Sequence, residues 1–290
     1  MNKADFKVDT GKCIGCGNCV KTCPGGVIYL NENRKADIAE FDDFGWNGCW
    51  KCEHCLAVCP TGAISIFGKK PDYSLPKYSV DETKMVFSSM VSNRHSCRRF
   101  RNKQVDRQMI NEMLDLLANA PNGGNKQQVE FTVIDDIDEM KYFRQLAYSR
   151  MEELAQKGVY PKGFDESSYN DMKRWEDTVR PDMLFCSAPH ILIPHAPVGK
   201  GEPIPDTIVA GTYFELLCNS RGLGAVMMTF PLDVLDCMPE IKGLLQIPED
   251  HYIGMIIGFG YPEINYARGV QKKMDRSRIH RIKFEEGITC

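Results

Sequence analysis

Two runs of cysteine have the residue type and the spacing for metal chemistry. The first run is Cys13, Cys16, Cys19 and Cys23, followed by Pro24, and the second is Cys49, Cys52, Cys55 and Cys59, followed by Pro60. Each run reads C-x-x-C-x-x-C-x-x-x-C-P, the spacing that binds iron–sulfur cubanes. Three closely spaced thiolates can cover one face of such a cube. The chain is therefore expected to hold two [4Fe–4S] clusters and to carry electrons.

The last cysteine of each run is expected to serve the other cluster. In two-cluster proteins the cysteine before the proline points away from the three that precede it. The sequence thus predicts one cluster on Cys13, Cys16, Cys19 and Cys59, and the other on Cys49, Cys52, Cys55 and Cys23. The stretch from Cys23 to Leu30 also matches the stretch from Cys59 to Ile66, which fits a duplicated, pseudo-symmetric module.

Other uses of cysteine fit this pattern poorly. Zinc prefers two separated Cys-x-x-Cys pairs that close one tetrahedron, which leaves no role for a third cysteine in each run or for the proline. The remaining cysteines are odd in number and scattered among apolar residues, so buried, reduced thiols are expected instead of a disulfide framework. These residues are Cys97, Cys186, Cys218, Cys237 and Cys290.

The sequence predicts a cytoplasmic protein that binds neither membrane nor nucleic acid. Residues Met1–Asp5 lack the apolar core of a signal peptide. No stretch approaches the roughly 18 uninterrupted apolar residues of a membrane-spanning helix. The net charge is −3, and neither part of the chain has the basic excess that nucleic-acid binding usually needs.

Composition and periodicity divide the chain into three parts. Residues 1–67 form the cysteine-rich domain, residues 68–84 read as a linker with prolines and no period, and residues 85–290 form a second domain. In the second domain we expect helices at 106–120, 138–156 and 206–221, and strands at 129–134, 183–193, 225–229 and 252–258. Because helices and strands mix without regular alternation, the expected fold class is α+β, a small two-cluster domain followed by a larger α+β domain.

A basic segment opens the second domain. Arg94, His95, Ser96 and Arg98 lie within five residues, and arginine forks and hydroxyls suit phosphate oxygens. At this point the sequence resembles the FMN-dependent nitroreductases. Three later stretches agree with that family in order, namely 120–127, 221–229, and 258–262 followed by Arg268. Residues 1–67 resemble two-cluster bacterial ferredoxins, so the whole chain resembles a ferredoxin–nitroreductase fusion.

The nitroreductase resemblance implies an obligate homodimer with two FMN sites built across the interface. It assigns the FMN phosphate and ribityl chain to Arg94, His95, Ser96, Arg98 and Arg268. It assigns the border of the flavin ring to Asn122, Gly123, Asn125 and Gln127, with backbone at Met228 and Thr229 near its reactive edge. Asn122 and Gly123 replace the family's usual serines, which removes a hydroxyl contact. No catalytic side chain is implied, because the flavin supplies the chemistry.

These features predict an FMN-dependent oxidoreductase that passes electrons from two clusters to a small acceptor. The acceptor could be a nitroaromatic, a quinone, a free flavin or an enone. The donor could be a low-potential redox protein, such as a ferredoxin or a hydrogenase, or NAD(P)H. An alternative is a relay between protein redox partners with no small-molecule substrate. A redox sensor is a third hypothesis, disfavoured because the sequence shows no DNA-binding surface or signalling output.

Isolated histidines and aromatic residues carry weaker signals. His54 is expected at the surface, and His190, His195, His251 and His280 show no ligand spacing, so each is expected to have an ordinary structural role. Tyr160, Tyr169 and Trp175 lie in the polar stretch where related enzymes carry a substrate lid. Simple packing is the more common role for such aromatic residues.

Overall fold

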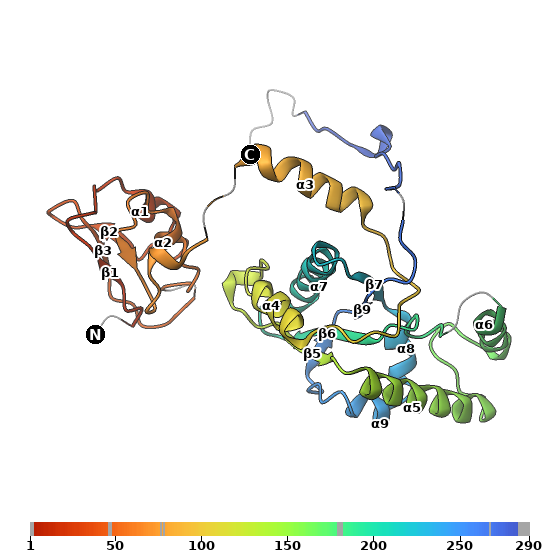
Figure 1. Cartoon of the computed structure of the whole chain (residues 1–290). Coiled ribbons are helices and arrows are strands. Elements are labelled where there is room, and N and C mark those ends of the chain that lie inside the picture. Colours follow the sequence, from red (N-terminus) through yellow and green to blue (C-terminus); the bar gives the residue numbers. More distant parts are fainter. Residues whose placement is uncertain are drawn as a thin grey trace.

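A computed structural model describes residues 3–45, 48–75, 77, 79–178, 182–266 and 268–283. Cys290, one of the cysteines outside the two runs, lies outside the described residues. Figure 1 shows a small, cysteine-rich module and a larger domain built on a sheet. We call them the cysteine module (3–67) and the sheet domain (80–283). Among the described residues, no helix is both long and apolar enough to cross a bilayer.

The cysteine module repeats one short pattern twice. Each half places a five-residue helix inside a cysteine run, and the two β-pairs are antiparallel. Its core is formed by small apolar residues and by the buried cysteines, among them Ala4, Ile64 and Ile66. The elements are β1 (Lys7–Val8), α1 (Asn18–Thr22), β2 (Ile28–Leu30), β3 (Ala36–Ile38), α2 (His54–Val58) and β4 (Ile64–Ser65).

The sheet domain has a five-stranded antiparallel sheet with the strand order β5-β6-β9-β7, and β8 pairs with β6. β6 lies at its centre and is buried along almost its whole length, as expected for a strand that is covered on both faces. The strands are β5 (Glu130–Ile134), β6 (His190–Pro197), β7 (Gly224–Met228), β8 (His251–Ile253) and β9 (Ile256–Gly260).

Helices cover the sheet (Figure 1). The three long helices expected from periodicity are present, with Asp106 and Asp136 accepting hydrogen bonds from the first-turn N–H groups of α4 and α5. The helices are α3 (Val80–Asn93), α4 (Arg107–Leu117), α5 (Ile137–Gln156), α6 (Glu166–Thr178), α7 (Pro203–Ser220), α8 (Phe230–Asp236) and α9 (Pro239–Gly243), with 3-10 turns at Pro71–Tyr73, Gly123–Asn125 and Arg276–Arg278.

Two of the expected strands differ in the structure. The strand expected at 183–193 begins only at His190, because Asp182 accepts hydrogen bonds from the N–H groups of Phe185 and Ser187 and holds that stretch in a turn. The strand expected at 252–258 is divided into β8 and β9, which pair with different parts of β6. The polar stretch after α5, for which no element was expected, contains α6.

Helix α3 begins at Val80, within the residues that the sequence assigned to a linker. Ser79 and Glu82 form a capping box at its start. None of its described residues is buried, although it carries apolar side chains such as Met85, which is 80% exposed, and Phe87. The C-terminal arm (262–283) is also exposed and apolar in places, for example at Met274 and Ile282.

Candidate cluster and flavin sites

The first predicted cysteine quartet is brought together by the fold. Cys13, Cys16, Cys19 and Cys59 line one small cavity, with Leu30, Ala36 and Ile64 among the residues that close it. Cys59 therefore faces the first run although it belongs to the second. A hydrogen bond from the N–H of Ala63 to the Cys59 Sγ measures 3.3 Å. Burial raises the pKa of the Cys59 thiol. The hydrogen bond from Ala63 and the other hydrogen bonds to Cys59 outweigh burial, so the pKa of the thiol is lowered overall.

The second quartet gathers in the same crossed way. Cys23 acts electrostatically on Cys49 and Cys55 together with Cys52, so a residue of the first run lies beside the second. Burial raises the pKa of Cys55 to about 12, and the thiolates of Cys49, Cys52 and Cys23 add to that rise. Burial also raises the pKa of Cys49, so a bound cation would favour the thiolate form of Cys49 and Cys55, and four converging cysteines are the donor set of a cubane.

Left-handed residues turn the chain so that each run can wrap. Gly17 and Glu53 occupy the position before α1 and α2, with φ of 75° and 58°. Each follows the second cysteine of its run, so the third cysteine folds back toward the first two. Glycine adopts this conformation freely, whereas for a glutamate the left-handed conformation costs roughly 1 kcal/mol of conformational free energy. Glu53 also pairs with Lys69.

The basic segment predicted to hold FMN lies along β7. The N–H of Cys97 donates to the carbonyl of Ala225 at 2.8 Å, and Ser96 bridges Ala225 in parallel. Gly224 has no room for a side chain, because a Cβ there would lie 2.6 Å from the Cβ of Cys97. The absence of a side chain at Gly224 thus lets the segment from Arg94 to Arg98 approach the strand that carries Met228.

Two cavities lie on successive parts of β7. The first contains Arg94 and His95 beside Gly224 and Ala225. The second, about 640 Å³ in volume, contains Arg98, Met228 and Thr229. Its other walls come from α6 and from the residues near α8, including Phe164, Asp171, Met172, Trp175 and Phe230. Six of the predicted flavin residues are thus brought to this strand or its cavities, namely Arg94, His95, Ser96, Arg98, Met228 and Thr229. Arg268 lies on the C-terminal arm and lines neither cavity.

The ion pair and the ring contact in this region could not be predicted from the sequence. Arg94 forms an ion pair with Glu215 of α7, with the Nη2–Oε1 distance at 2.9 Å, and the Glu215 side chain is only 10% exposed. The His95 ring lies 3.7 Å from the ring of Tyr266, measured between centroids. Among the described basic residues that were assigned to the phosphate, Arg98 and Arg268 have no ion pair with a carboxylate.

The amide-rich loop lies elsewhere. Asn122, Asn125 and Gln127 line a cavity of about 780 Å³ between the cysteine module and α4. The Nδ2 of Asn125 donates to the carbonyl of Trp50 at 2.8 Å. The N–H of Gly123 donates to Asp206 at 2.9 Å. Within one chain, the structure therefore does not place this loop in the cavities along β7.

The aromatic residues considered for a lid separate into two groups. Trp175 lines the 640 Å³ cavity and is about half exposed. Tyr169 is buried and donates to Glu152 at 2.7 Å, and Tyr160 donates to the carbonyl of Ala155. Only Trp175 among the three is therefore available to a ligand in that cavity.

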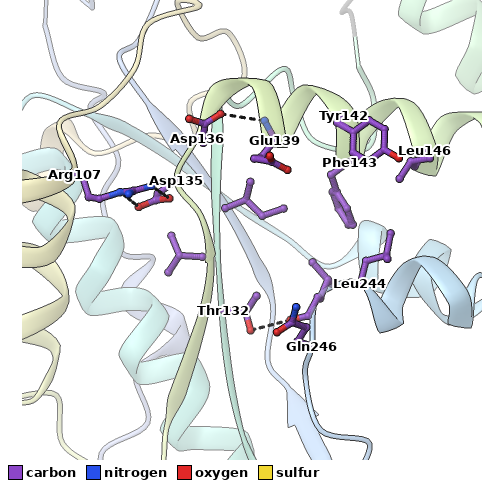
Figure 2. A pocket seen from close by; sticks show the side chains of 13 residues that line it. Arg107, Thr132, Asp135, Asp136, Glu139, Tyr142, Phe143, Leu146, Leu244 and Gln246 are labelled. Carbon is purple, nitrogen blue, oxygen red and sulfur yellow. Dashed lines mark hydrogen bonds and ion pairs between the residues drawn. The ribbon is translucent and has the colours of Figure 1, made fainter.

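A further cavity, of about 660 Å³, contains none of the predicted site residues (Figure 2). It lies between β5, α5 and the segment after α9. Arg107 forms a two-pronged pair with Asp135 at its rim, at 2.9 and 3.0 Å. The Thr132 hydroxyl lies in its floor and donates to the carbonyl of Leu245 at 3.4 Å.

Comparisons with known proteins agree with this division of the chain. Residues 91–261 match the nitroreductase family, and residues 12–83 match the 4Fe-4S dicluster domain. The chain is 25% identical over 205 residues to a putative NADH dehydrogenase/NAD(P)H nitroreductase of Methanothermobacter thermautotrophicus, covering 70% of this chain and 90% of the relative. It is 24% identical over 204 residues to the iodotyrosine deiodinase of Danio rerio, covering 66% of this chain and 65% of the deiodinase.

The N-terminal part has its own relative. It is 38% identical over 64 residues to an uncharacterized ferredoxin of Methanocaldococcus jannaschii, covering 22% of this chain and 79% of the ferredoxin. Two solved structures share the fold of the sheet domain. A nitroreductase with bound FMN from Desulfitobacterium hafniense has a TM-score of 0.52 at 19% identity, covering 67% of this chain and 96% of that chain. A nitroreductase with bound FMN from Bacteroides fragilis has a TM-score of 0.50 at 18% identity, and the match covers 71% of this chain and 100% of that chain.

These findings confirm the α+β fold class and the two-part resemblance. The nitroreductase match spans more than half of the chain, and the ferredoxin relative is covered over most of its length. The chain belongs to the nitroreductase family, as an oxidoreductase that carries an N-terminal 4Fe-4S dicluster ferredoxin domain.

Proposed function

We propose that the protein is an FMN-dependent reductase that draws electrons through its own ferredoxin domain and delivers them to a small planar acceptor. The observation that carries this proposal is the pair of cavities along β7. One end offers arginine and histidine for an anionic group, and the other offers methionine and aromatic walls for a flat ring. Such a donor set fits a flavin mononucleotide, whose phosphate and ring need these two environments.

In this proposal the chain consists of a cluster-binding domain (1–67), a linker (68–84) and an FMN-binding domain (85–290). Arg94, His95 and Ser96, together with Arg268, would hold the FMN phosphate, and Arg98, which lines the second cavity, would contact the ribityl chain. Backbone at Met228 and Thr229 would border the ring. The two crossed cysteine quartets would hold the clusters. When bound, the clusters supply single electrons at low potential, and FMN supplies the two-electron chemistry.

A homodimer would complete the flavin site. The loop with Asn122, Gly123, Asn125 and Gln127 lies apart from the β7 cavities within one chain. The exposed apolar side chains of α3 and of the C-terminal arm offer a surface that a second copy would cover. In that assembly, the amide loop of one protomer would reach the flavin of its partner.

The two quartets face different surroundings. Cys16 is exposed, and the nearby Ile14 is 67% exposed, so one edge of the first quartet is open to solvent. A low-potential redox protein would dock at this edge. Cys52 of the second quartet lines the cavity beside the amide loop. The walls of Met172, Trp175 and Phe230 favour an apolar, planar acceptor such as a quinone, a nitroaromatic, a free flavin or an enone. NAD(P)H is the alternative donor.

Anaerobic purification with iron, sulfide and FMN quantified per chain tests the cofactors. Cys16→Ser should abolish reduction of the acceptor by a reduced ferredoxin while FMN stays bound, and Cys237→Ser, outside both runs, should leave it unchanged. Activity of Cys16→Ser equal to that of the parent would refute the cluster route. A protein that reduces other redox proteins but shows no saturation with any small acceptor would be a relay, and the reductase proposal would fall.

A further inference from the structure

Three side chains from three strands converge at one place on the sheet, away from the sites described above. Glu130 lies directly opposite His195 in the β5–β6 register. His251 lies opposite Pro197, two residues along β6 from His195, so its side chain emerges on the same face. None of the three lines the cavities along β7 or the cavity beside the cysteine module.

The ligand-type atoms of these residues are close enough to share one ion. One donor atom from each of Glu130, His195 and His251 lies within 4.8 Å of the other two. The Nδ1 atoms of His195 and His251 are 2.8 Å apart. The His195 side chain is almost fully buried at 3% exposure, whereas Glu130 is exposed and His251 is partly buried. The cluster therefore has a fixed base and an edge that is open to solvent.

A second layer of hydrogen bonds orients His195. Its Nε2 lies 3.2 Å from the Thr132 hydroxyl, and that hydroxyl donates to the carbonyl of Leu245 (Figure 2). With the hydroxyl proton directed to Leu245, the Nε2 of His195 would donate to Thr132. The Nδ1 of His195 would then keep its lone pair on the side of His251. Metal-binding histidines characteristically fix their tautomer through a partner on the far nitrogen in this way.

We propose that Glu130, His195 and His251 bind a divalent transition ion of the Zn²⁺ class. Two imidazole nitrogens and one carboxylate oxygen are a ligand set that Zn²⁺ takes, with a fourth position left to water. The ion would require the two Nδ1 atoms to move slightly apart from their hydrogen-bonded distance. Strand β8 spans only His251–Ile253, and among the described strands it pairs with β6 alone. The ion would therefore link this short strand to β5 as well as to β6.

Zinc titration of the cluster-loaded protein by calorimetry tests this site, after dialysis against a chelator under anaerobic conditions. The parent should bind one more Zn²⁺ per chain than His251→Ala, and its melting temperature should rise with Zn²⁺ where that of the variant does not. His280→Ala, which removes an exposed histidine, is the matched control and should behave as the parent. Glu130→Gln changes an exposed residue and keeps the test valid if His251→Ala does not fold.

Removing the orienting hydroxyl separates metal binding from general folding. Thr132→Val should lower the Zn²⁺ affinity by about 10- to 100-fold, as loss of such outer partners does. X-ray absorption at the zinc edge should show nitrogen and oxygen neighbours only. Equal Zn²⁺ binding by the parent, Glu130→Gln and His251→Ala, or a sulfur-dominated spectrum, would overturn the proposal. The His195–His251 contact would then be a hydrogen bond between two imidazoles.

Discussion

The side-chain amide of Asn125 donates a hydrogen bond to the backbone carbonyl of Trp50, with an Nδ2–O distance of 2.8 Å. Trp50 lies between Cys49 and Cys52 of the second quartet, and Asn125 lies in the amide-rich loop of the sheet domain. This bond therefore joins the second cysteine run directly to a loop that the family resemblance assigns to the flavin. Asn125 has a positive φ of 53°, a conformation that asparagine tolerates better than most residues.

The first prediction concerns this contact. Asn125→Gly keeps the left-handed backbone and removes the hydrogen bond, which contributes about 1 kcal/mol in a typical case. We expect flavin reduction by a reduced ferredoxin to slow about fivefold in stopped-flow absorbance, while the iron content stays that of the parent. Asn119→Ala, which changes another amide of the same cavity, is the control. Identical rates in both variants and the parent would show that the contact is irrelevant to electron transfer.

The second prediction concerns the crossed cysteine quartets. Cys59→Ser should remove the same cluster as Cys13→Ser, because both thiols face one cavity. Cys23→Ser should match Cys52→Ser instead. The electron paramagnetic resonance spectra of the reduced variants will therefore group by position in space and not by position in the sequence. A spectrum of Cys59→Ser that matches Cys52→Ser would disprove the crossed arrangement.

The third prediction concerns Arg94 and Glu215. Arg94→Met leaves the buried Glu215 carboxylate without its partner, and loss of one member of a buried pair costs several kcal/mol. Because the Arg94 side chain is 38% exposed, we expect a smaller loss of about 2 kcal/mol in the free energy of unfolding. Arg94→Met/Glu215→Leu should recover most of the stability, as measured by denaturant unfolding.

The same double variant separates two roles of Arg94. If Arg94 also neutralises the FMN phosphate, the double variant will regain stability yet retain FMN poorly, because its positive charge is still missing. FMN retention after gel filtration measures this. Parent-like FMN retention in the double variant would restrict Arg94 to its pairing with Glu215.

The fourth prediction concerns pH and His190. This residue is fully buried, its Nε2 accepts a hydrogen bond from the N–H of Val105 at 3.1 Å, and burial lowers its pKa to about 4. The unfolded chain, with an ordinary histidine pKa near 6.5, binds more protons between these two values. Stability from the neutral imidazole is thus fully present above about pH 6.5 and is lost as the pH falls toward 4.

The size of this effect can be measured by comparison with His190→Gln, which has no group that titrates in this range. Between pH 7 and pH 5 the parent should lose about 2 kcal/mol more of its unfolding free energy than the variant. Urea unfolding of the full chain at pH 5, 6 and 7 checks this. Parallel losses in both proteins would mean that His190 is not the titrating group.

Much of the cluster architecture could be predicted from the sequence. Ligand spacing is local, so the cysteine runs and the pseudo-repeat predicted which thiols gather, including the exchange of Cys23 and Cys59. Helices also follow from local periodicity and capping, as α4 and α5 show. The turn at Asp182 was missed although its hydrogen bonds to Phe185 and Ser187 are local, because the apolar run 183–193 also has the composition of a buried strand. The division between β8 and β9 was missed because it depends on pairing with β6, which lies far away along the chain.

The sequence by itself determined the chemical character of the chain: two cysteine runs with the spacing of cubane ligands and a basic segment suited to phosphate. Each can be recognised because its residues are neighbours in the chain. Only the tertiary structure decided which distant residues meet. It paired Arg94 with Glu215, placed the His95 ring against that of Tyr266, joined Asn125 to Trp50, and brought His195 to His251 through strand register. Such contacts arise from sheet pairing and packing between distant segments, and no local spacing encodes them.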